Sequence, residues 1–168
     1  MKDIELRLIC ELMRNCRRSD RVLAKAIGVS QPTVSRVRTR LEKEGLIEYS
    51  GVPNLRKLGF EIVSIIFGNR SKHEPDAKLR VQKAKDFVAK RPNLIFASTG
   101  VGLESDRVAV SVHKNYSDYA KYVNDIKTEW AGLMTVTGSF IISLNSDNVL
   151  RPISMKYLAG CLRKEELE

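Results

Sequence analysis

The chain has few of the residues that build metal centres and disulfide frameworks. Its 168 residues include three cysteines and two histidines. Cys10, Cys16 and Cys161 are odd in number and form no CxxC pair, which argues against a zinc site or a disulfide framework. His73 and His113 lie far apart in the sequence, and an isolated histidine is more often a structural residue than a ligand. We therefore expect no metal ion and no cofactor.

Long apolar runs and catalytic groupings are also missing from the sequence. No apolar run approaches the roughly 20 residues that a transmembrane helix needs. The first residues are typical of an amphipathic helix and not of a signal-peptide core. No Ser/His/Asp, Cys/His or paired-carboxylate pattern stands out. The expectation is a cytoplasmic protein that is not an enzyme.

Positive charge is what the chain has in excess. The net charge is +9 and the pI is about 9.6, so nucleic acid or an anionic surface is the natural class of partner. Hydrophobic residues make up 43% of the chain, which is enough to form real cores. The length suits one or two small domains.

The stretch from Arg17 to Ile47 is the most informative part of the sequence, because it has the layout of a helix-turn-helix. Ser19 or Asp20 can cap a first helix, and Gly28 can end it in the left-handed conformation. Ser30 can cap a second helix, which ends at Gly45. The expected apolar positions are Val22, Leu23, Ala26 and Ile27 in the first helix and Val34, Val37 and Leu41 in the second. Leu46–Tyr49 then predicts a short strand that begins a wing.

The second helix of this motif is predicted to read DNA in the major groove. Its polar face, opposite the buried one, carries arginines that can donate two parallel hydrogen bonds to a guanine edge. Between Arg14 and Lys43 there are nine Lys or Arg and two acidic residues, a charge of about +7 that attracts phosphates. The candidate DNA contacts are Arg17, Arg18, Lys25, Ser30, Gln31, Pro32, Thr33, Ser35, Arg36, Arg38, Thr39 and Arg40.

The helix-turn-helix is preceded by one more helix and followed by a connector. Residues 4–14 predict a helix whose buried stripe is supplied by Ile4, Leu8, Ile9 and Leu12 and should pack under the helix-turn-helix. Cys10 is expected in or near this core. Gly51 and Pro53 mark residues 51–60 as a connector.

From Phe60 onward the pattern changes to alternating strands and helices. Strands are predicted at 62–67, 94–99, 108–113 and 134–144, and helices at residues 77–88 and 119–130. This order is β-α-β-β-α-β, the split ferredoxin-like motif. Gly100 and Gly102 lack the full GxGxxG pattern of a phosphate cradle, which favours a tight strand connection with positive φ at this turn.

Such a sheet has helices on one face only, so its other face must meet water or a partner. On the last strand that face should carry either Thr135, Thr137, Ser139, Ile141 and Ser143 or the alternate residues. Self-association through this sheet is expected, since a DNA reader also needs two half-sites. Residues 152–166 predict a helix that packs on the same domain or on a partner subunit.

These features resemble the Lrp/AsnC family of prokaryotic transcription regulators. The resemblance covers nearly the whole chain, from the winged helix-turn-helix to the βαββαβ domain. It is carried by Leu8, Ile9, Leu12, Asn15, Arg17, Ser19, Leu23-Ala24, Gly28-Val29-Ser30, Thr33-Val34, Arg36, Arg40-Leu41-Glu42, Gly45-Leu46-Ile47, the connector Asn54–Gly59 and Thr99-Gly100. It implies an α+β fold with a winged helix-turn-helix at 1–50, a connector at 51–60, a ferredoxin-like effector and oligomerisation domain at 61–150, and a helical tail at 151–168.

The resemblance also implies a function. The chain is expected to be a sequence-specific regulator that binds double-stranded DNA as a homodimer or octamer and responds to a small metabolite such as an amino acid. The residues expected to contact that effector are Thr99, Gly100, Gly102 and Asp106. Two alternatives remain. One is an architectural DNA binder indifferent to sequence. The other is an enzyme similar to the siroheme decarboxylases, which is disfavoured by the basic helix and the small number of histidines.

Overall fold

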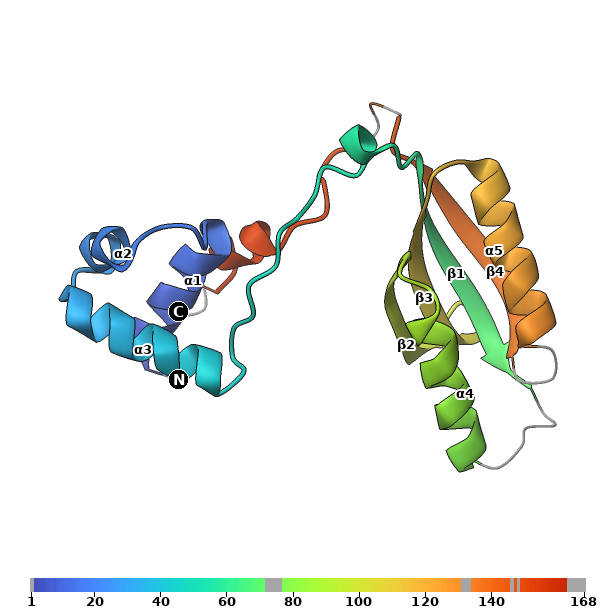
Figure 1. Cartoon of the computed structure of the whole chain (residues 1–168), viewed down its shortest axis with the longest axis horizontal. Coiled ribbons are helices and arrows are strands. Elements are labelled where there is room, and N and C mark those ends of the chain that lie inside the picture. Colours follow the sequence, from blue (N-terminus) through green and yellow to red (C-terminus); the bar gives the residue numbers. More distant parts are fainter. Residues whose placement is uncertain (1, 72–76, 131–133, 146, 148, 163–168) are drawn as a thin grey trace. The chain divides into compact units, whose positions relative to one another are not determined.

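The computed structural model describes residues 2–71, 77–130, 134–145, 147 and 149–162, which form two compact units. The first unit comprises Met1–Val52 and Arg151–Glu168, and the second comprises Pro53–Leu150. Figure 1 shows helices alone in the first unit and a sheet with two helices in the second. The predicted α+β class is therefore confirmed.

Three helices build the first unit: α1 (Asp3–Arg14), α2 (Asp20–Ile27) and α3 (Gln31–Lys43). Their shared core contains Leu8, Leu12, Leu23, Ala24, Ile27, Val34, Val37 and Leu41. The apolar stripes predicted for α1 and α3 are confirmed. The prediction for α2 was wrong at Val22 and Ala26, since Val22 is 49% exposed and Ala26 is exposed. Ala24, which was not predicted, is buried in their place. Only Leu23, Ala24 and Ile27 of this short helix face the core that it shares with α1 and α3.

The ends of α2 and α3 follow the capping rules. Ser19, and not Asp20, caps α2, since its side chain accepts a hydrogen bond from the Val22 N–H at 3.4 Å. Gly28 ends that helix with a φ of 72° and Gly45 follows α3 with a φ of 67°, as predicted. The Arg7 guanidinium also donates to the Ile27 carbonyl, which ties α1 to the turn between α2 and α3.

The predicted wing strand is not formed: Leu46–Tyr49, which the structure describes, has no regular secondary structure. The backbone N–H of Leu46 is used by the end of α3 and donates to the Leu41 carbonyl at 2.9 Å. The Tyr49 side chain is held by Arg38 of α3 at 3.0 Å. Contacts with the helix thus replace the strand pairing that a wing would need.

The C-terminal segment packs on α1 of the first unit. It forms a short 3-10 helix, η2 (Met155–Gly160), where a helix over 152–166 was predicted; residues 163–166 lie outside the described chain. Ala159 of η2 is fully buried, and its carbonyl accepts from Arg14 Nη2 at 3.5 Å. The expectation that this tail would pack on the second domain was therefore wrong for Met155–Gly160.

The second unit has the predicted β-α-β-β-α-β order. Its elements are β1 (Ile62–Arg70), α4 (Ala77–Ala89), β2 (Leu94–Gly102), β3 (Ser105–His113), α5 (Tyr116–Glu129) and β4 (Met134–Ser143), preceded by the 3-10 turn η1 (Arg56–Leu58). The four strands form an antiparallel sheet in the order β2-β3-β1-β4. Side chains of α4 and α5 pack on one sheet face, around Ile62 and Ile66.

The tight connection between β2 and β3 is not at the glycines where it was predicted. Strand β2 runs through Gly100 and Gly102, and the turn consists of Leu103 and Glu104, with φ values of 50° and 53°. A two-residue hairpin of this kind needs positive φ at both central residues. The Asn69 side chain donates to the Glu104 carbonyl at 2.6 Å and holds this unfavourable backbone in place.

A register shift opposite Phe67 and Gly68 changes which residues of β4 face the helices. Met134 and Val136 lie on the helix side, and beyond the shift Ser139 does, where its Oγ is 2.6 Å from the Tyr119 hydroxyl. The prediction of strict alternation along β4 was therefore wrong. Gly68 is required here, because a Cβ would lie 2.9 Å from the Thr135 carbonyl oxygen.

Candidate nucleic-acid interface

The N-terminal tip of α3 is rigid and open to solvent. Ser30 caps it by accepting from the Thr33 N–H at 3.4 Å, and its Oγ is 2.8 Å from Thr33 Oγ1. Pro32 lies in the first turn, where its missing N–H is not needed. Gln31 and Pro32 are exposed, so this tip can approach a groove without displacing other parts of the unit.

Arg38 faces the protein and not the solvent side of α3. Its guanidinium donates to Asp20 Oδ1 at 3.1 Å, Glu42 Oε1 at 3.1 Å and the Tyr49 hydroxyl at 3.0 Å. Partial burial lowers the pKa of Arg38, but these hydrogen bonds outweigh it and raise the pKa above its ordinary value. Arg38 therefore links α3 to α2 and to the segment after α3.

Arg40 is also held inside the first unit. Its guanidinium pairs with Glu5 of α1 and lies 3.9 Å from Glu44 of the following turn. The hydrogen bond that Glu5 accepts from the Lys2 backbone N–H lowers the pKa of this carboxyl, burial opposes that shift, and the charge of Arg40 adds to it. Arg40 thus links α3 to α1, although its side chain is still 41% exposed.

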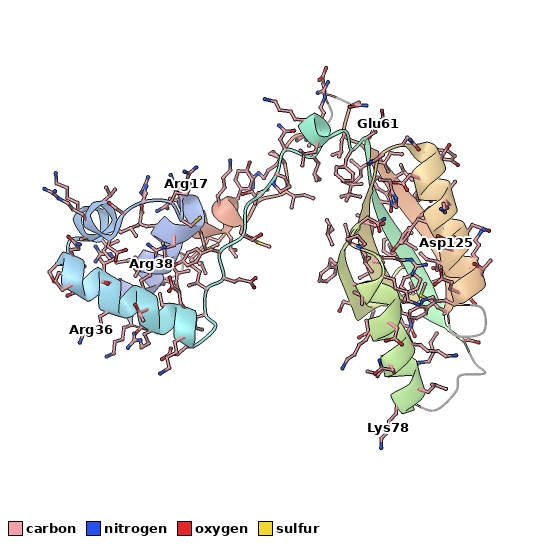
Figure 2. All side chains as sticks on the ribbon, in the orientation of Figure 1. Arg17, Arg36, Arg38, Glu61, Lys78 and Asp125 are labelled. Atoms are coloured by element: carbon pink, nitrogen blue, oxygen red, sulfur yellow. The ribbon has the colours of Figure 1, made fainter. Side chains whose placement is uncertain are left out.

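Arg36 differs from the other two arginines of α3. It is exposed, and it forms no hydrogen bond or ion pair with any described residue. Figure 2 shows it on the side of α3 opposite Arg38. Ser35 and Thr39 are exposed on the same helix. Of the three arginines of α3 predicted to read DNA, Arg36 is the one whose guanidinium N–H groups are not used by other described residues.

Further cations without a carboxylate partner among the described residues surround this surface. They are Arg17, Arg21, Lys25 and Lys43, all exposed. Arg18, by contrast, pairs with Glu11, which also binds Arg14. Arg21 and Lys43 were missed by sequence reasoning. The counting of basic residues pointed to the whole stretch and could not separate the paired cations from the free ones.

The four residues proposed to contact an effector lie near one another on the β2–β3 hairpin, where Thr99 pairs with Arg107 and Gly102 pairs with Ser105. Thr99, Gly100 and Gly102 lie along β2, and Asp106 lies on β3. The Asp106 carboxylate accepts from the Arg70 backbone N–H at 3.0 Å, and the Asp106 N–H donates to the Asn69 side chain at 2.9 Å. Asp106 is thus used to join β1 to β3 next to the turn.

One polar cluster was not found from the sequence. Ser64 and Ser111 hydroxyls lie 3.2 and 2.9 Å from His113 Nε2, and Asp118 Oδ2 is 3.9 Å from Nδ1. The residue types suggest a catalytic triad, but both serines and the histidine are fully buried. Burial lowers the pKa of His113, and the charge of Asp118 only partly opposes this. The cluster is a neutral core network to which a substrate has no access.

No group of three or more His, Cys, Asp or Glu in the described part of the chain could hold a metal ion. His73 lies outside the described residues. Among the described helices none is long and apolar enough to cross a membrane.

Comparisons with known proteins agree with this interface. The winged helix-turn-helix DNA-binding family matches residues 1–48. The leucine-responsive regulatory protein of Rhizobium meliloti is 28% identical over 134 residues, 79% of this chain and 83% of that protein. Two solved structures share the fold. AsnC of E. coli has a TM-score of 0.67 at 16% identity, over 91% of this chain and 97% of that one.

The second is a Neisseria meningitidis transcriptional regulator in complex with L-Met. It has a TM-score of 0.72 at 15% identity and covers 94% of this chain and 99% of that one. The helix-turn-helix match covers residues 1–48 of the first unit, and the structural matches cover both units. Residues 1–48 thus match the winged helix-turn-helix DNA-binding family, and the chain as a whole has the fold of AsnC and of the Neisseria meningitidis regulator.

Proposed function

We propose that the chain is a transcription regulator that binds double-stranded DNA sequence-specifically, with α3 in the major groove. The observation that carries this proposal is the division of labour among the arginines of α3. Arg38 and Arg40 are held by carboxylates of the first unit, whereas Arg36 is exposed and has no partner among the described residues. A fixed helix that presents one free guanidinium is suited to read a guanine edge.

The free cations around α3 are proposed to contact phosphates. Arg17, Arg21, Lys25 and Lys43 carry no sequence information themselves, but phosphate contacts set the register and orientation of a reading helix. Arg18 makes a smaller contribution because Glu11 neutralises it. Gln31, Pro32, Ser35 and Thr39 remain candidates for groove contacts, while Ser30 and Thr33 mainly stabilise the helix tip.

Self-association is proposed to occur through the sheet face opposite α4 and α5. Cross-strand rows on that face are apolar: Ile142, Val63 and Val112 form one, and Phe140, Ile65, Val110 and Phe96 form the next. Phe96 is 55% and Phe140 is 62% exposed, which is costly for large aromatic side chains in an ordered sheet. A second copy related by a two-fold axis would cover this face and supply the second reading helix.

Control by a small metabolite is a further part of the proposal. It is supported by the L-Met complex of the Neisseria meningitidis regulator with the same fold. Thr99, Gly100, Gly102 and Asp106 lie together at the β2–β3 end, but the Asp106 carboxylate already accepts from the Arg70 backbone N–H, so an effector there would need groups from a second copy as well.

The function is tested by selecting duplexes from a random pool with the purified full chain and sequencing the bound fraction. A regulator should enrich one motif made of two half-sites about one helical turn apart, or a multiple of it. An Arg36→Ala variant selected in parallel should lose preference at one base pair in each half-site. Failure to enrich any motif would favour the second candidate, an architectural DNA binder, which the large basic surface alone could support. We do not propose an enzymatic activity. The free arginine and the basic surface of α3 both favour DNA binding, and the relatives are transcription regulators.

A further inference from the structure

The chain crosses between the two units twice. The N-terminal connector crosses at Val52-Pro53 and the C-terminal connector at Leu150-Arg151. Figure 1 shows that β1 begins and β4 ends at the same end of the sheet, where Ile62 pairs with Ser143. Directly beyond this pair, the Leu144 N–H donates to the Glu61 carbonyl at 2.7 Å. The two connectors therefore share one point of attachment on the second unit.

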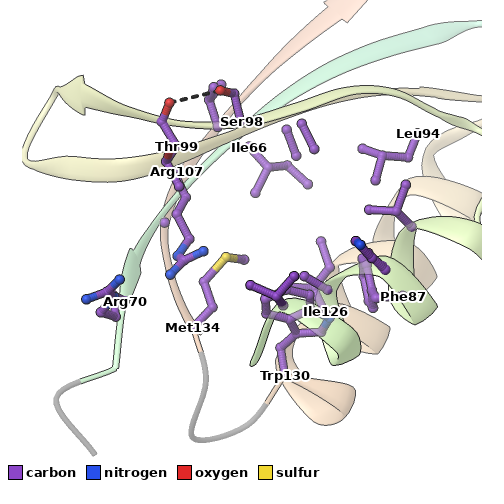
Figure 3. Close-up of a pocket in the computed structure, with 18 of the residues that line it drawn as sticks. Ile66, Arg70, Phe87, Leu94, Ser98, Thr99, Arg107, Ile126, Trp130 and Met134 are labelled. Carbon is purple, nitrogen blue, oxygen red and sulfur yellow. Dashed lines mark hydrogen bonds between the residues drawn. The ribbon is translucent and has the colours of Figure 1, made fainter. Parts of the chain in front are cut away.

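This shared attachment lies at the opposite end of β1 from the effector candidates. Strand β1 ends at Arg70, whose backbone N–H is bound by Asp106. Arg70, Thr99 and Arg107 line a cavity of about 610 Å³ between the sheet and the two helices of the second unit (Figure 3). The residues around Glu61 are not part of that lining, so the connectors are separate from the proposed effector region.

On the first unit the two connectors are attached to different helices. The N-terminal connector is held at α3, because the Tyr49 hydroxyl accepts from Arg38 Nε at 3.0 Å. The C-terminal connector leads into η2, which packs on α1, where Ala159 is fully buried and its carbonyl accepts from Arg14. A single flexible connector leaves the orientation of a unit free, whereas two separate attachments restrict its rotation.

Local contacts hold the C-terminal segment together from Arg151 onward. Ser154 caps η2 by accepting from the Lys156 N–H at 3.3 Å. Two cations lie over the Tyr157 ring, with the Arg151 guanidinium 4.6 Å and the Lys156 ammonium 5.0 Å from its centroid. Arg151 is therefore connected to η2 as part of the first unit.

The helix on which η2 packs is itself joined to the reading helix α3. Glu5 of α1 forms an ion pair with Arg40 of α3. Leu8 of α1 and Leu41 of α3 are both fully buried in the core that the three helices share. Because α1 and α3 belong to one packed body, an attachment that holds α1 also limits the orientation of α3.

We propose that η2 is a second tether, whose docking on α1 limits the rotation of the reading helix and thereby selects the spacing between two half-sites. This inference rests on the proposed function, since spacing matters only to a regulator that reads two half-sites. Ala159 is then a positioning residue that acts through α1. A first unit held by the N-terminal connector alone would accept several spacings, because a flexible linker lets its ends reach a range of separations.

Lengthening the C-terminal connector loosens the tether without altering the first unit. An insertion of about eight Gly/Ser residues between Leu150 and Arg151, both exposed, leaves η2 intact and adds a flexible reach of roughly 15 Å. Ala159→Glu is a second variant, which releases η2 by placing a charge in its buried contact with α1. Met155→Glu is its matched control, because it adds the same charge to η2 at an exposed position.

Binding is measured by fluorescence anisotropy on duplexes that differ only in half-site spacing. The wild type should bind about tenfold or more weakly when one half-site is moved by half a helical turn, onto the opposite face of the duplex. The insertion variant and Ala159→Glu should bind both spacings within about threefold, whereas Met155→Glu should keep the wild-type preference. The insertion variant should bind a single half-site like the wild type, a result that separates positioning from folding.

The tether is also measured without DNA, by NMR relaxation of the backbone amides. The amides of α1 and α3 should report a shorter rotational correlation time in the insertion variant than in the wild type, because the first unit gains freedom to turn.

The proposal is overturned if the first unit of the wild type already tumbles independently of the second, or if the insertion variant keeps the wild-type spacing preference. It is also overturned if Met155→Glu loses that preference as Ala159→Glu does. A wild type that binds no duplex with two half-sites would overturn the proposed function instead, and the relaxation comparison would still decide whether η2 is a tether.

Discussion

Replacing Arg36 with alanine should damage DNA recognition and leave folding intact. The side chain is exposed and has no partner among the described residues, so the free energy of unfolding should change by no more than about 0.5 kcal/mol. A bidentate arginine–guanine pair contributes about 1–3 kcal/mol of base discrimination. At about 1.4 kcal/mol per tenfold, each half-site should lose roughly 5-fold to 150-fold in affinity for its preferred base.

Arg38→Ala is the matched control on the same helix, and it should have the opposite profile. It removes hydrogen bonds to Asp20, Glu42 and Tyr49 from a side chain that is 24% exposed. We expect a loss of about 1–2 kcal/mol of stability, which is modest because the pairs are partly solvated. Affinity should fall for all sequences together, because the orientation of the whole helix becomes less fixed.

Fluorescence anisotropy on a panel of single-base variants of the selected duplex would measure discrimination, and urea unfolding would measure stability. The reasoning is refuted if Arg36→Ala weakens every duplex equally while Arg38→Ala relaxes the preference at one base pair. It is also refuted if Arg36→Ala unfolds as easily as Arg38→Ala.

Three other predictions follow from the same structure. The logarithm of DNA affinity should fall linearly with the logarithm of salt concentration, with a slope of roughly −5 to −9 for about 6–10 phosphate contacts per dimer; an affinity that is constant from low to moderate salt would exclude this electrostatic contribution. Phe140→Asp, on the exposed sheet face, should convert the dimer into a folded monomer in analytical ultracentrifugation, whereas Lys121→Asp on α5 should not. The pKa of His113 is lowered in the folded state, so as the pH falls the unfolded chain is protonated at this residue before the folded chain is. The contribution of neutral His113 to the free energy of unfolding should be fully present above about pH 6.5, the ordinary pKa. It should decrease as the pH falls from there toward the lower pKa of the folded state. Urea midpoints of the wild type should therefore drop more steeply from pH 7 to pH 5 than those of His113→Gln, and equal slopes would assign the acid sensitivity to other groups.

Local rules were sufficient to predict much of this fold. Ser30 and Gly28 act on the few backbone groups next to them, so the ends of α2 and α3 could be read from the sequence. The order of strands and helices in the second unit also followed from local periodicity. The helix-turn-helix and its basic character were therefore accessible without the structure.

Features that depend on distant partners were not accessible. The pairing of Arg38 with Asp20 and of Arg40 with Glu5 is set by how three helices pack, so no spacing rule could tell these arginines from Arg36. The register shift opposite Gly68 depends on two strands far apart in the sequence. The cavity depends on how α4 lies over the sheet, and the packing of η2 on α1 joins the two ends of the chain.

The packing of η2 also limits how the units can be separated in an experiment. A fragment that ends near Gly59 would lack η2 and expose the surface of α1 that Ala159 covers. Loss of DNA binding by such a fragment would not distinguish a missing second half-site from a damaged first unit. Point variants on the sheet face, such as Phe140→Asp, avoid this ambiguity.

The central claim is that the full chain binds a discrete DNA site through α3, and DNase I footprinting in the presence of excess non-specific competitor tests it most directly. On a fragment that carries the selected motif, the wild type should protect one region with two half-sites on the same face of the duplex. The Arg36→Ala variant should need a higher concentration for the same protection. Uniform coverage of the fragment, or protection that disappears entirely when competitor is added, would contradict the account.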